Sequence, residues 1–310
     1  MTEKTVSVVV PVYYNADSLP LLHERLTAVE NTLMDLHGVR LQLVFVNDGS
    51  RDASQAELVR IKEQRPDAVV VRLSRNFGAV HASRTGFQFV EGDAFVILAA
   101  DLQDPPELLL EMVPRWLAGR KFVIAVRKSR EDPVVSRICS WLYYRLLRLL
   151  VLPGYPEGGF DIALMDRDML EPMRNCSKNA FTPLLAYWLG YEPEVVSYHR
   201  PRREHGRSGW TFTKKIKSFV DVMLGFSVTP IRLVSALGVV VAGSSFLYGI
   251  SVVIAALTGH IPVPGYATLV SLVTFLLGLI ILMLGIIGEY LWRIFDEVNR
   301  RPDTVIDEVL

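Results

Sequence analysis

Short apolar runs recur along the first half of the chain, each bounded by glycine, proline or polar residues: residues 6–12, 41–46, 68–73, 95–100 and 121–126. Runs of this length, rich in β-branched residues, are typical of buried strands. Helical patterns lie between them, beginning near Leu19, after Ser50 and over residues 81–90. Strands alternating with helices predict an α/β fold, with a mostly parallel sheet that carries helices on both faces.

Residues 133–152 form one long amphipathic pattern. Its apolar side chains recur at helical spacing, namely Ile138, Trp141, Leu142, Leu146, Leu149 and Leu150. Arg137, Arg145 and Arg148 fall largely on another face. A basic amphipathic helix with aromatic residues favours the surface of an anionic membrane. A helix that packs against the core of the domain is the alternative.

Two much longer apolar runs, at about 231–257 and 266–290, occupy the last third of the chain. Each exceeds the roughly 20 residues with which a helix crosses a bilayer. The linker between them has no lysine or arginine, whereas basic residues precede the first run and follow the second. The positive-inside rule therefore predicts a transmembrane hairpin with both termini in the cytoplasm. A buried helical hairpin in a soluble protein is the alternative.

Composition changes this picture little. Half of the 310 residues are hydrophobic (50%), and 33 basic residues balance 33 acidic ones, so the net charge excludes no class of partner. Cys139 and Cys176 lack the spacing of a metal site and indicate reduced cytoplasmic thiols. Because a strand begins so close to Met1, we expect no cleavable signal peptide.

Polar side chains stand directly after the early strands: Tyr13 and Asn15, Asp48, Arg75 and Asn76, and Asp101 and Gln103. Because the carboxyl ends of parallel strands meet at one edge of a sheet, we expect these groups to converge there. Oxygen ligands at alternate positions, as in Asp101 and Gln103, suit Mg²⁺ or Mn²⁺ carrying a diphosphate. Each residue taken alone is also a common turn or cap residue.

Two basic segments follow. Arg127, Lys128 and Arg130 come after the fifth strand and suit phosphate binding, with a solvated loop as the alternative. Residues 199–217 mix basic side chains with Trp210 and Phe212. This composition before an apolar run suits lipid headgroups and makes nucleic acid the weaker interpretation.

Motifs at the strand ends, PVYYN at 11–15, NDGS at 47–50, SRNFG at 74–78 and ADLQDPPE at 100–107, form a recognisable series. The series resembles that of the family-2 glycosyltransferases, and within them the dolichol-phosphate and undecaprenyl-phosphate sugar transferases. The resemblance implies a GT-A fold and a nucleotide-sugar donor bound by Pro11, Tyr13, Asn15, Asp48, Arg75, Asp101 and Gln103. It also implies a metal, Mg²⁺ or Mn²⁺, on Asp101 and Gln103.

On the acceptor side, the resemblance implies an acid near the acceptor phosphate and sugar, which would be Asp161, with a helix cap or sheet-edge acid as the alternative. We expect catalytic roles for Asp101, Asp161 and Arg127. Contacts to the acceptor phosphate are then expected from Arg127, Arg130, Arg203, Ser208 and Lys214. The chain departs from the family pattern at Asn15, often a glutamate, and at Ala99, often a metal-binding acid. We therefore expect a metal with few protein ligands, completed by diphosphate and water, as Mg²⁺ tolerates.

The resulting expectation is a membrane glycosyltransferase for cell-envelope glycans, which moves a sugar from a nucleotide sugar to polyprenyl (undecaprenyl) phosphate at the cytoplasmic face, with inversion. Residues 1–132 would bind the donor, 133–228 the acceptor, 229–292 would span the membrane, and 293–310 would form a cytoplasmic tail. A homo-oligomer is compatible with this, and nucleic acid is not an expected partner.

Two other functions stay open. The first is a processive polysaccharide synthase, which usually has more spans and a Gln-x-x-Arg-Trp motif that is absent here. The second is a catalytically silent membrane subunit of the same fold, which Ala99, Gly159 and Gly209 favour.

Overall fold

The computed structural model describes residues 3–127, 134–177, 180–198, 223, 225–227, 229–258, 265–299 and 301–310. The chain divides into two compact units. The first consists of Met1–Lys215 together with Pro302–Leu310, and the second is Ile216–Arg301.

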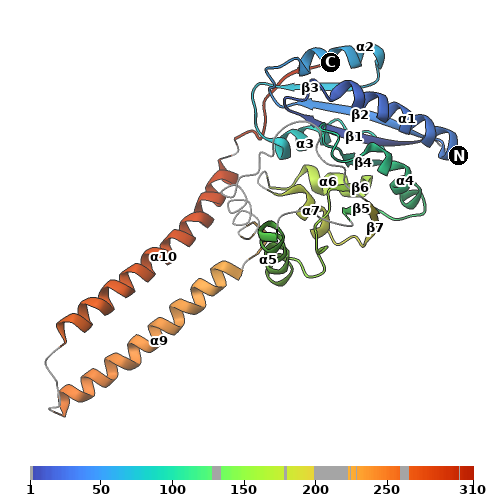
Figure 1. The fold of residues 1–310 in the computed structure, drawn as a ribbon. Coiled ribbons are helices and arrows are strands. Elements are labelled where there is room, and N and C mark those ends of the chain that lie inside the picture. Colours follow the sequence, from blue (N-terminus) through green and yellow to red (C-terminus); the bar gives the residue numbers. More distant parts are fainter. Residues whose placement is uncertain are drawn as a thin grey trace. The chain divides into compact units, whose positions relative to one another are not determined.

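The first unit is built on an eight-stranded sheet in the order β7-β5-β6-β4-β1-β2-β3-β8 (Figure 1). The strands are β1 Lys4–Val12, β2 Val39–Asn47, β3 Val69–Leu73, β4 Ala94–Ile97, β5 Phe122–Arg127, β6 Ile162–Asp166, β7 Pro193–Tyr198 and β8 Ile306–Val309. Strand β1 pairs in parallel with β2 and β4, and β2 pairs in parallel with β3. Strand β6 runs antiparallel to β4 and β5, β7 runs parallel to β5, and β8 runs antiparallel to β3. The predicted α/β fold with a mostly parallel sheet is confirmed.

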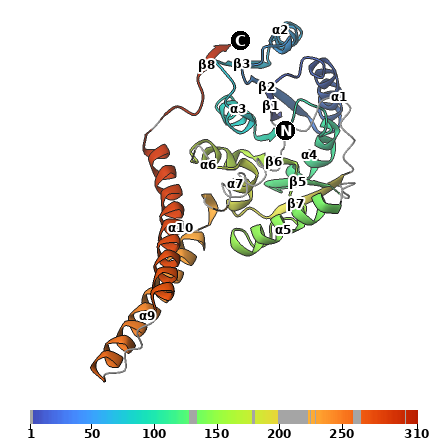
Figure 2. The same cartoon turned by 60° about the vertical axis from the view of Figure 1, so that its left-hand side comes forward.

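Helices cover both faces of this sheet (Figure 2). They are α1 Leu19–His37, α2 Ser54–Gln64, α3 Ala79–Phe87, η1 Pro106–Leu108, α4 Leu109–Leu117, α5 Val134–Leu150, η2 Arg167–Met169, α6 Leu170–Arg174 and α7 Thr182–Trp188. Helix α1 packs against β2, α2 and α4, whereas α3 packs against β1, β2 and α6. Helix α3 ends at Phe87, earlier than the predicted Val90.

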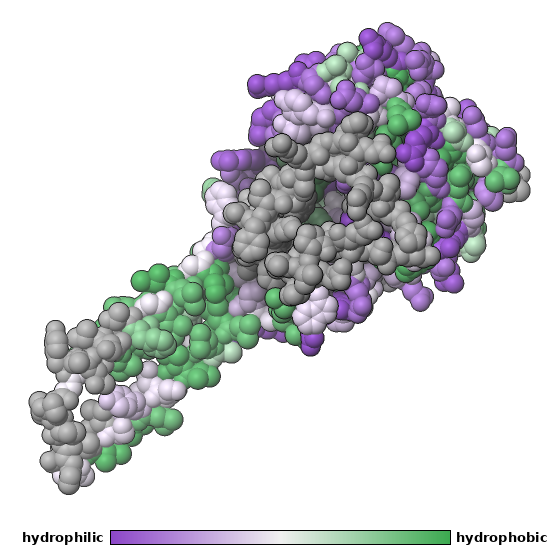
Figure 3. Space-filling view, in the orientation of Figure 1, coloured by the Kyte–Doolittle hydropathy of each residue, from purple (hydrophilic) through white to green (hydrophobic). Residues whose placement is uncertain are grey.

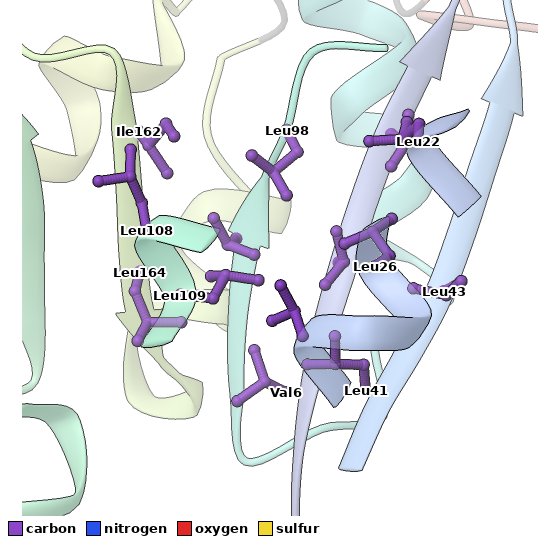
Figure 4. Packing of buried hydrophobic residues seen from close by; sticks show 14 of the residues in the cluster. Val6, Leu22, Leu26, Leu41, Leu43, Leu98, Leu108, Leu109, Ile162 and Leu164 are labelled. Carbon is purple, nitrogen blue, oxygen red and sulfur yellow. The ribbon is translucent and has the colours of Figure 1, made fainter. Parts of the chain in front are cut away.

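The core that holds the strand ends in place lies between α1, η1, α4 and the sheet (Figure 4). Leu22 and Leu26 of α1 are fully buried, as are Val6 of β1 and Leu43 of β2. Each such side chain stabilises the fold by about 1.5–3 kcal/mol through burial. On the opposite face, a Cβ at Gly86 would collide with the side chain of Val9, so α3 lies directly on β1. The sheet edge is thus set by rigid packing on both faces.

Helix α5 agrees with the predicted helix, but its apolar side chains do not form one buried face. Trp141, Leu142 and Leu149 are exposed, whereas Leu147 is buried and Leu146 is half-buried. The helix packs on the domain through one side and presents apolar side chains on another. Packing against the domain is therefore observed for this helix, and its contact with a membrane surface stays a prediction.

The second unit contains helices α9 Thr229–Leu257 and α10 Tyr266–Val298. Two segments, Thr229–Tyr248 and Phe275–Val298, are long and apolar enough to cross a membrane by length and composition. Only 6% and 0% of these segments is buried within the chain. Their surface forms an apolar band (Figure 3). The two helices contact each other, and a Cβ at Gly238 would lie 3.1 Å from Cε of Met283.

The C-terminal stretch differs from the expected solvated tail. Helix α10 continues to Val298, and Ile306–Val309 then pair with β3 as strand β8 (Figure 2). The strand residues are exposed, but backbone hydrogen bonds join Leu310 and Val70 in both directions, at 2.8 and 3.1 Å. Asp303 also forms an ion pair with Arg84 of α3 at 3.1 Å. The last residues therefore belong to the first unit.

Candidate active site

The segments that follow β1, β2, β3 and β4 lie side by side, because these strands are parallel neighbours in the sheet. Hydrogen bonds join the segments across the edge. The backbone N of Tyr14 donates to Oγ of Ser50 at 3.2 Å, and Oγ of Ser18 donates to the carbonyl oxygen of Ala100 at 2.6 Å. The predicted convergence of the strand ends is therefore present.

Asp48 fixes the loop between β3 and α3. Its side chain is buried (2% exposed), and its two carboxylate oxygens accept from the backbone N of Phe77 at 2.7 Å and of Gly78 at 2.8 Å. Gly49 adopts a left-handed φ of 67°, and a Cβ there would lie 2.5 Å from the carbonyl carbon of Arg75. Asp48 thus shapes a loop, and the nucleoside contact that the resemblance implies for it stays a prediction.

This loop carries Arg75, and two tyrosines, Tyr13 and Tyr14, follow β1 at the same edge of the sheet. The guanidinium of Arg75 lies 4.1 Å from the centroid of the Phe77 ring, which holds it by a cation–π contact. Tyr13 is exposed, its ring is edge-on to Tyr14, and its backbone N donates to Oδ1 of Asn15 at 2.9 Å. Pro11 is half-buried within β1, next to this turn. An exposed aromatic ring and an oriented guanidinium are suitable for stacking and phosphate contacts.

The acidic segment after β4 carries local strain. Leu102 adopts a left-handed φ of 59°, which is costly for a residue with a side chain and concentrates at functional sites. The turn brings the backbone N of Gln103 within 3.2 Å of Oδ1 of Asp101. Both residues are half-buried. The left-handed turn thus keeps both side chains partly open at the strand edge.

Asp101 and Gln103 fit a divalent cation held by few protein oxygens. Within the described residues, no three His, Cys, Asp or Glu side chains form a cluster that could hold a metal by themselves. Carboxylate and amide oxygens are hard ligands that suit Mg²⁺ or Mn²⁺ when substrate oxygens complete the shell. The side chain of Ala99 contributes no ligand, as the sequence indicates.

A second cluster lies where β5, β6 and β7 meet. Nε and Nη2 of Arg127 donate to the two oxygens of Asp161, and these side chains are only 26% and 15% exposed. Arg127 ends β5 and stands opposite Tyr198, the last residue of β7. The hydroxyl of Tyr198 contacts Oδ2 of Asp161 at 2.9 Å and Oδ1 of Asp104 at 3.1 Å.

The charges of this cluster are fixed by their neighbours. Burial alone would lower the pKa of Arg127, but the hydrogen bonds and charge of Asp161 raise it overall, so Arg127 stays protonated. Burial, together with the charges of Asp104 and Asp161, raises the pKa of Tyr198. Tyr198 therefore keeps its proton and acts as a hydrogen-bond donor.

The sequence analysis missed Tyr198. The only sequence signal is a tyrosine at the end of an apolar–polar alternation, directly before the basic segment at 199–217.

Gly159, which was named in favour of a catalytically silent subunit, is a glycine for a packing reason. It adopts a left-handed φ of 70°, and a Cβ there would collide with the ring and hydroxyl of Tyr144 from α5. Tyr144 stacks on Tyr155, which contacts Tyr187 at a centroid distance of 5.2 Å. This aromatic cluster anchors α5 beside the turn that carries Asp161. Of the other predicted phosphate ligands, Arg130, Arg203, Ser208 and Lys214 lie outside the described residues.

Comparisons with known proteins agree with the motif series. Residues 7–174 match the family Glycosyl transferase family 2. The uncharacterized glycosyltransferase YkcC of Bacillus subtilis is 34% identical over 97% of this chain and 93% of its own length. The bactoprenol glucosyl transferase of Shigella phage SfII is 31% identical over 97% of both chains.

Solved structures with a similar fold are more distant. Mannosyl-3-phosphoglycerate synthase from Rubrobacter xylanophilus has a TM-score of 0.49 and 17% identity over 71% of each chain. Similarity at this level carries no argument about chemistry. The family match, and the two relatives that align over nearly the whole chain, assign its class. The chain is a glycosyl transfer enzyme and belongs to glycosyl transferase family 2.

Proposed function

We propose that this enzyme transfers one sugar from a nucleotide-sugar donor to polyprenyl phosphate at the cytoplasmic face of a membrane, for cell-envelope glycans. The observation that carries the proposal is the occurrence of a family-2 catalytic unit and an exposed apolar hairpin in one chain. A relative that aligns over 97% of both chains is named bactoprenol glucosyl transferase, and bactoprenol is a polyprenyl lipid. This combination favours a lipid-borne acceptor over a soluble one.

The donor side consists of the segments after β1, β2, β3 and β4. In this proposal, Pro11, Tyr13, Asn15 and Asp48 hold the nucleoside, and Arg75 contacts the phosphates. Asp101 and Gln103 would hold Mg²⁺ or Mn²⁺, which would neutralise charge that develops on the departing diphosphate. The backbone contacts of Asp48 support this arrangement, because they keep the Arg75 loop beside the turn after β2.

The acceptor side consists of Arg127, Asp161 and Tyr198. A phosphate monoester has a second pKa of about 6 and is largely dianionic at neutral pH. Its oxygen can attack the anomeric carbon without a protein base, so the protein has chiefly to position it. The planar fork of Arg127, held by Asp161, is suited to binding that phosphate. Attack from the face opposite the diphosphate then inverts the anomeric centre.

The connectivity of the two units supports a hairpin that enters and leaves the membrane on the same side. Strands β7 and β8 both belong to the catalytic unit, and the apolar helices lie between them in sequence. An even number of crossings follows for any membrane-spanning arrangement of this chain. The exposed Trp141, Leu142 and Leu149 of α5 further support contact with the membrane surface.

The test is transfer by the purified full-length protein, with a panel of nucleotide sugars and a short-chain polyprenyl phosphate, with and without Mn²⁺. A lipid carrying a single sugar is the expected product. A polymer would favour the processive synthase, and the absence of turnover across the panel would favour the silent subunit. Either of these two results would overturn the proposal.

A further inference from the structure

The hydroxyl of Tyr198 lies between two carboxylates from different strand ends. Its Oη is 2.9 Å from Oδ2 of Asp161 and 3.1 Å from Oδ1 of Asp104, and the residue is 6% exposed. Asp104, itself 7% exposed, belongs to the acidic segment of the donor side. One buried hydroxyl therefore ties the donor side to the acceptor side.

The contact to Asp161 continues to Arg127. Asp161 accepts from Nε and Nη2 of the guanidinium, so this side of the fork cannot turn without moving the carboxylate. A guanidinium carries about five N–H donors, and Asp161 takes two of them, which leaves others for an anion. The pairing of β5 with β7 places Arg127 and Tyr198 directly opposite each other. Both side chains contact Asp161, so the three lie together at this edge of the sheet.

We propose that Tyr198 is a positioning residue which, through Asp161, holds the Arg127 fork in the orientation that binds the phosphate of the acceptor. The identity of the acceptor as polyprenyl phosphate rests on the proposed function. The inference itself concerns the binding of an alkyl phosphate monoester. Without the hydroxyl, Asp161 loses its hydrogen bond to the last residue of β7, and with it one of the contacts that orient the Arg127 guanidinium.

A purely structural role for this tyrosine makes a different prediction, and Tyr187 offers the matched comparison. Its hydroxyl donates to the backbone oxygen of Gly154 at 2.7 Å, and its ring packs in the aromatic cluster. Tyr187→Phe removes the same chemical group from the same unit without touching Asp161. If hydroxyl loss acted only through stability, the two variants would affect ligand binding alike.

The experiment measures binding of a short-chain polyprenyl monophosphate to the full-length protein in detergent, without nucleotide sugar. Tyr198→Phe should weaken this affinity about tenfold, the scale of one charge-assisted hydrogen bond. Tyr187→Phe should change it less than about twofold. Added to Arg127→Ala, Tyr198→Phe should cause no further loss, because it acts through Arg127.

Three results would overturn the inference: wild-type affinity in Tyr198→Phe, a full additional loss in the Arg127→Ala background, or no binding of the probe by the wild-type protein. If Tyr198→Phe does not fold, p-aminophenylalanine at position 198 restores a donor and should bind the probe within about threefold of wild type. Loss of binding in that variant also overturns the inference. Wild-type protein that binds the probe but transfers no sugar would refute the proposed function alone.

Discussion

Replacing Asp48 by asparagine tests whether its carboxylate holds the β3–α3 loop. Asparagine keeps one oxygen that can accept from the backbone N of Phe77 or of Gly78, but it presents an amide NH₂ to the other. Loss of charge assistance on one bond costs about 1 kcal/mol, and a stranded buried N–H costs about 1–3 kcal/mol. We therefore expect Asp48→Asn to lower the free energy of unfolding by about 2–4 kcal/mol.

The assay is thermal unfolding of the detergent-solubilised protein, followed by circular dichroism. In a unit of this size, 1 kcal/mol corresponds to about 2–4 °C, so the midpoint should fall by about 4–16 °C. The KM for the nucleotide sugar should rise as well, because the same loop carries Arg75.

Asp52→Asn is the control for this measurement. The oxygens of Asp52 accept from the backbone N of Ala16 and Ser54 at the longer distances of 3.4 and 3.2 Å, and the residue is half-buried. Replacing the Asp52 carboxylate should therefore lower the free energy of unfolding by less than about 1 kcal/mol. Equal midpoints for the two variants would refute the assignment of the loop to Asp48.

Three further outcomes are expected. Asp101→Ala should abolish sugar transfer and leave the unfolding midpoint within a few degrees of wild type; retained transfer would remove Asp101 from the site. Burial alone would raise the pKa of Glu107, but the hydrogen bond and charge of Arg25 lower it overall. Its ion pair therefore stabilises the fold above the ordinary pKa of 4.5 and is lost as pH falls through the lowered value. Because the pair is partly exposed, Glu107→Gln should lower the free energy of unfolding by less than about 1 kcal/mol at neutral pH. In strong acid the variant and the wild type should be equally stable; a difference in stability that persists there would contradict this. Removal of residues 302–310 should lower the midpoint and promote self-association through the edge of β3, measured by gel filtration, whereas an unchanged, monodisperse protein would show that β8 is dispensable.

The donor side was predictable from sequence because its elements are signalled locally. Strands β1 and β2 are continuous apolar runs that are buried on both faces, and proline or glycine marks their ends. Once the strands are parallel neighbours, topology alone brings Asp48 and Asp101 to the same edge. What the pattern could not reveal is that both oxygens of Asp48 bind backbone amides of the next loop.

The acceptor side depends on long-range contacts and was predicted less completely. Strand β7 begins with Pro193 and Glu194 and buries only two of its six residues, so it has no clear apolar run. The contact of Tyr198 with Asp104 joins residues 94 positions apart, which local periodicity cannot detect. Strand β8 is missed for a related reason: its charged Asp307 pairs with Arg72 of β3 at 2.9 Å, and in isolation it resembles a solvated tail.

Strand β8 also sets an order of events in biogenesis. It follows both apolar helices in the sequence, and it belongs to the same sheet as β1, which precedes them. The apolar helices must therefore leave the ribosome before the sheet can be completed. A nascent chain carries an open β3 edge throughout synthesis of the hairpin, so the finished catalytic sheet is itself a sign that the hairpin has been made.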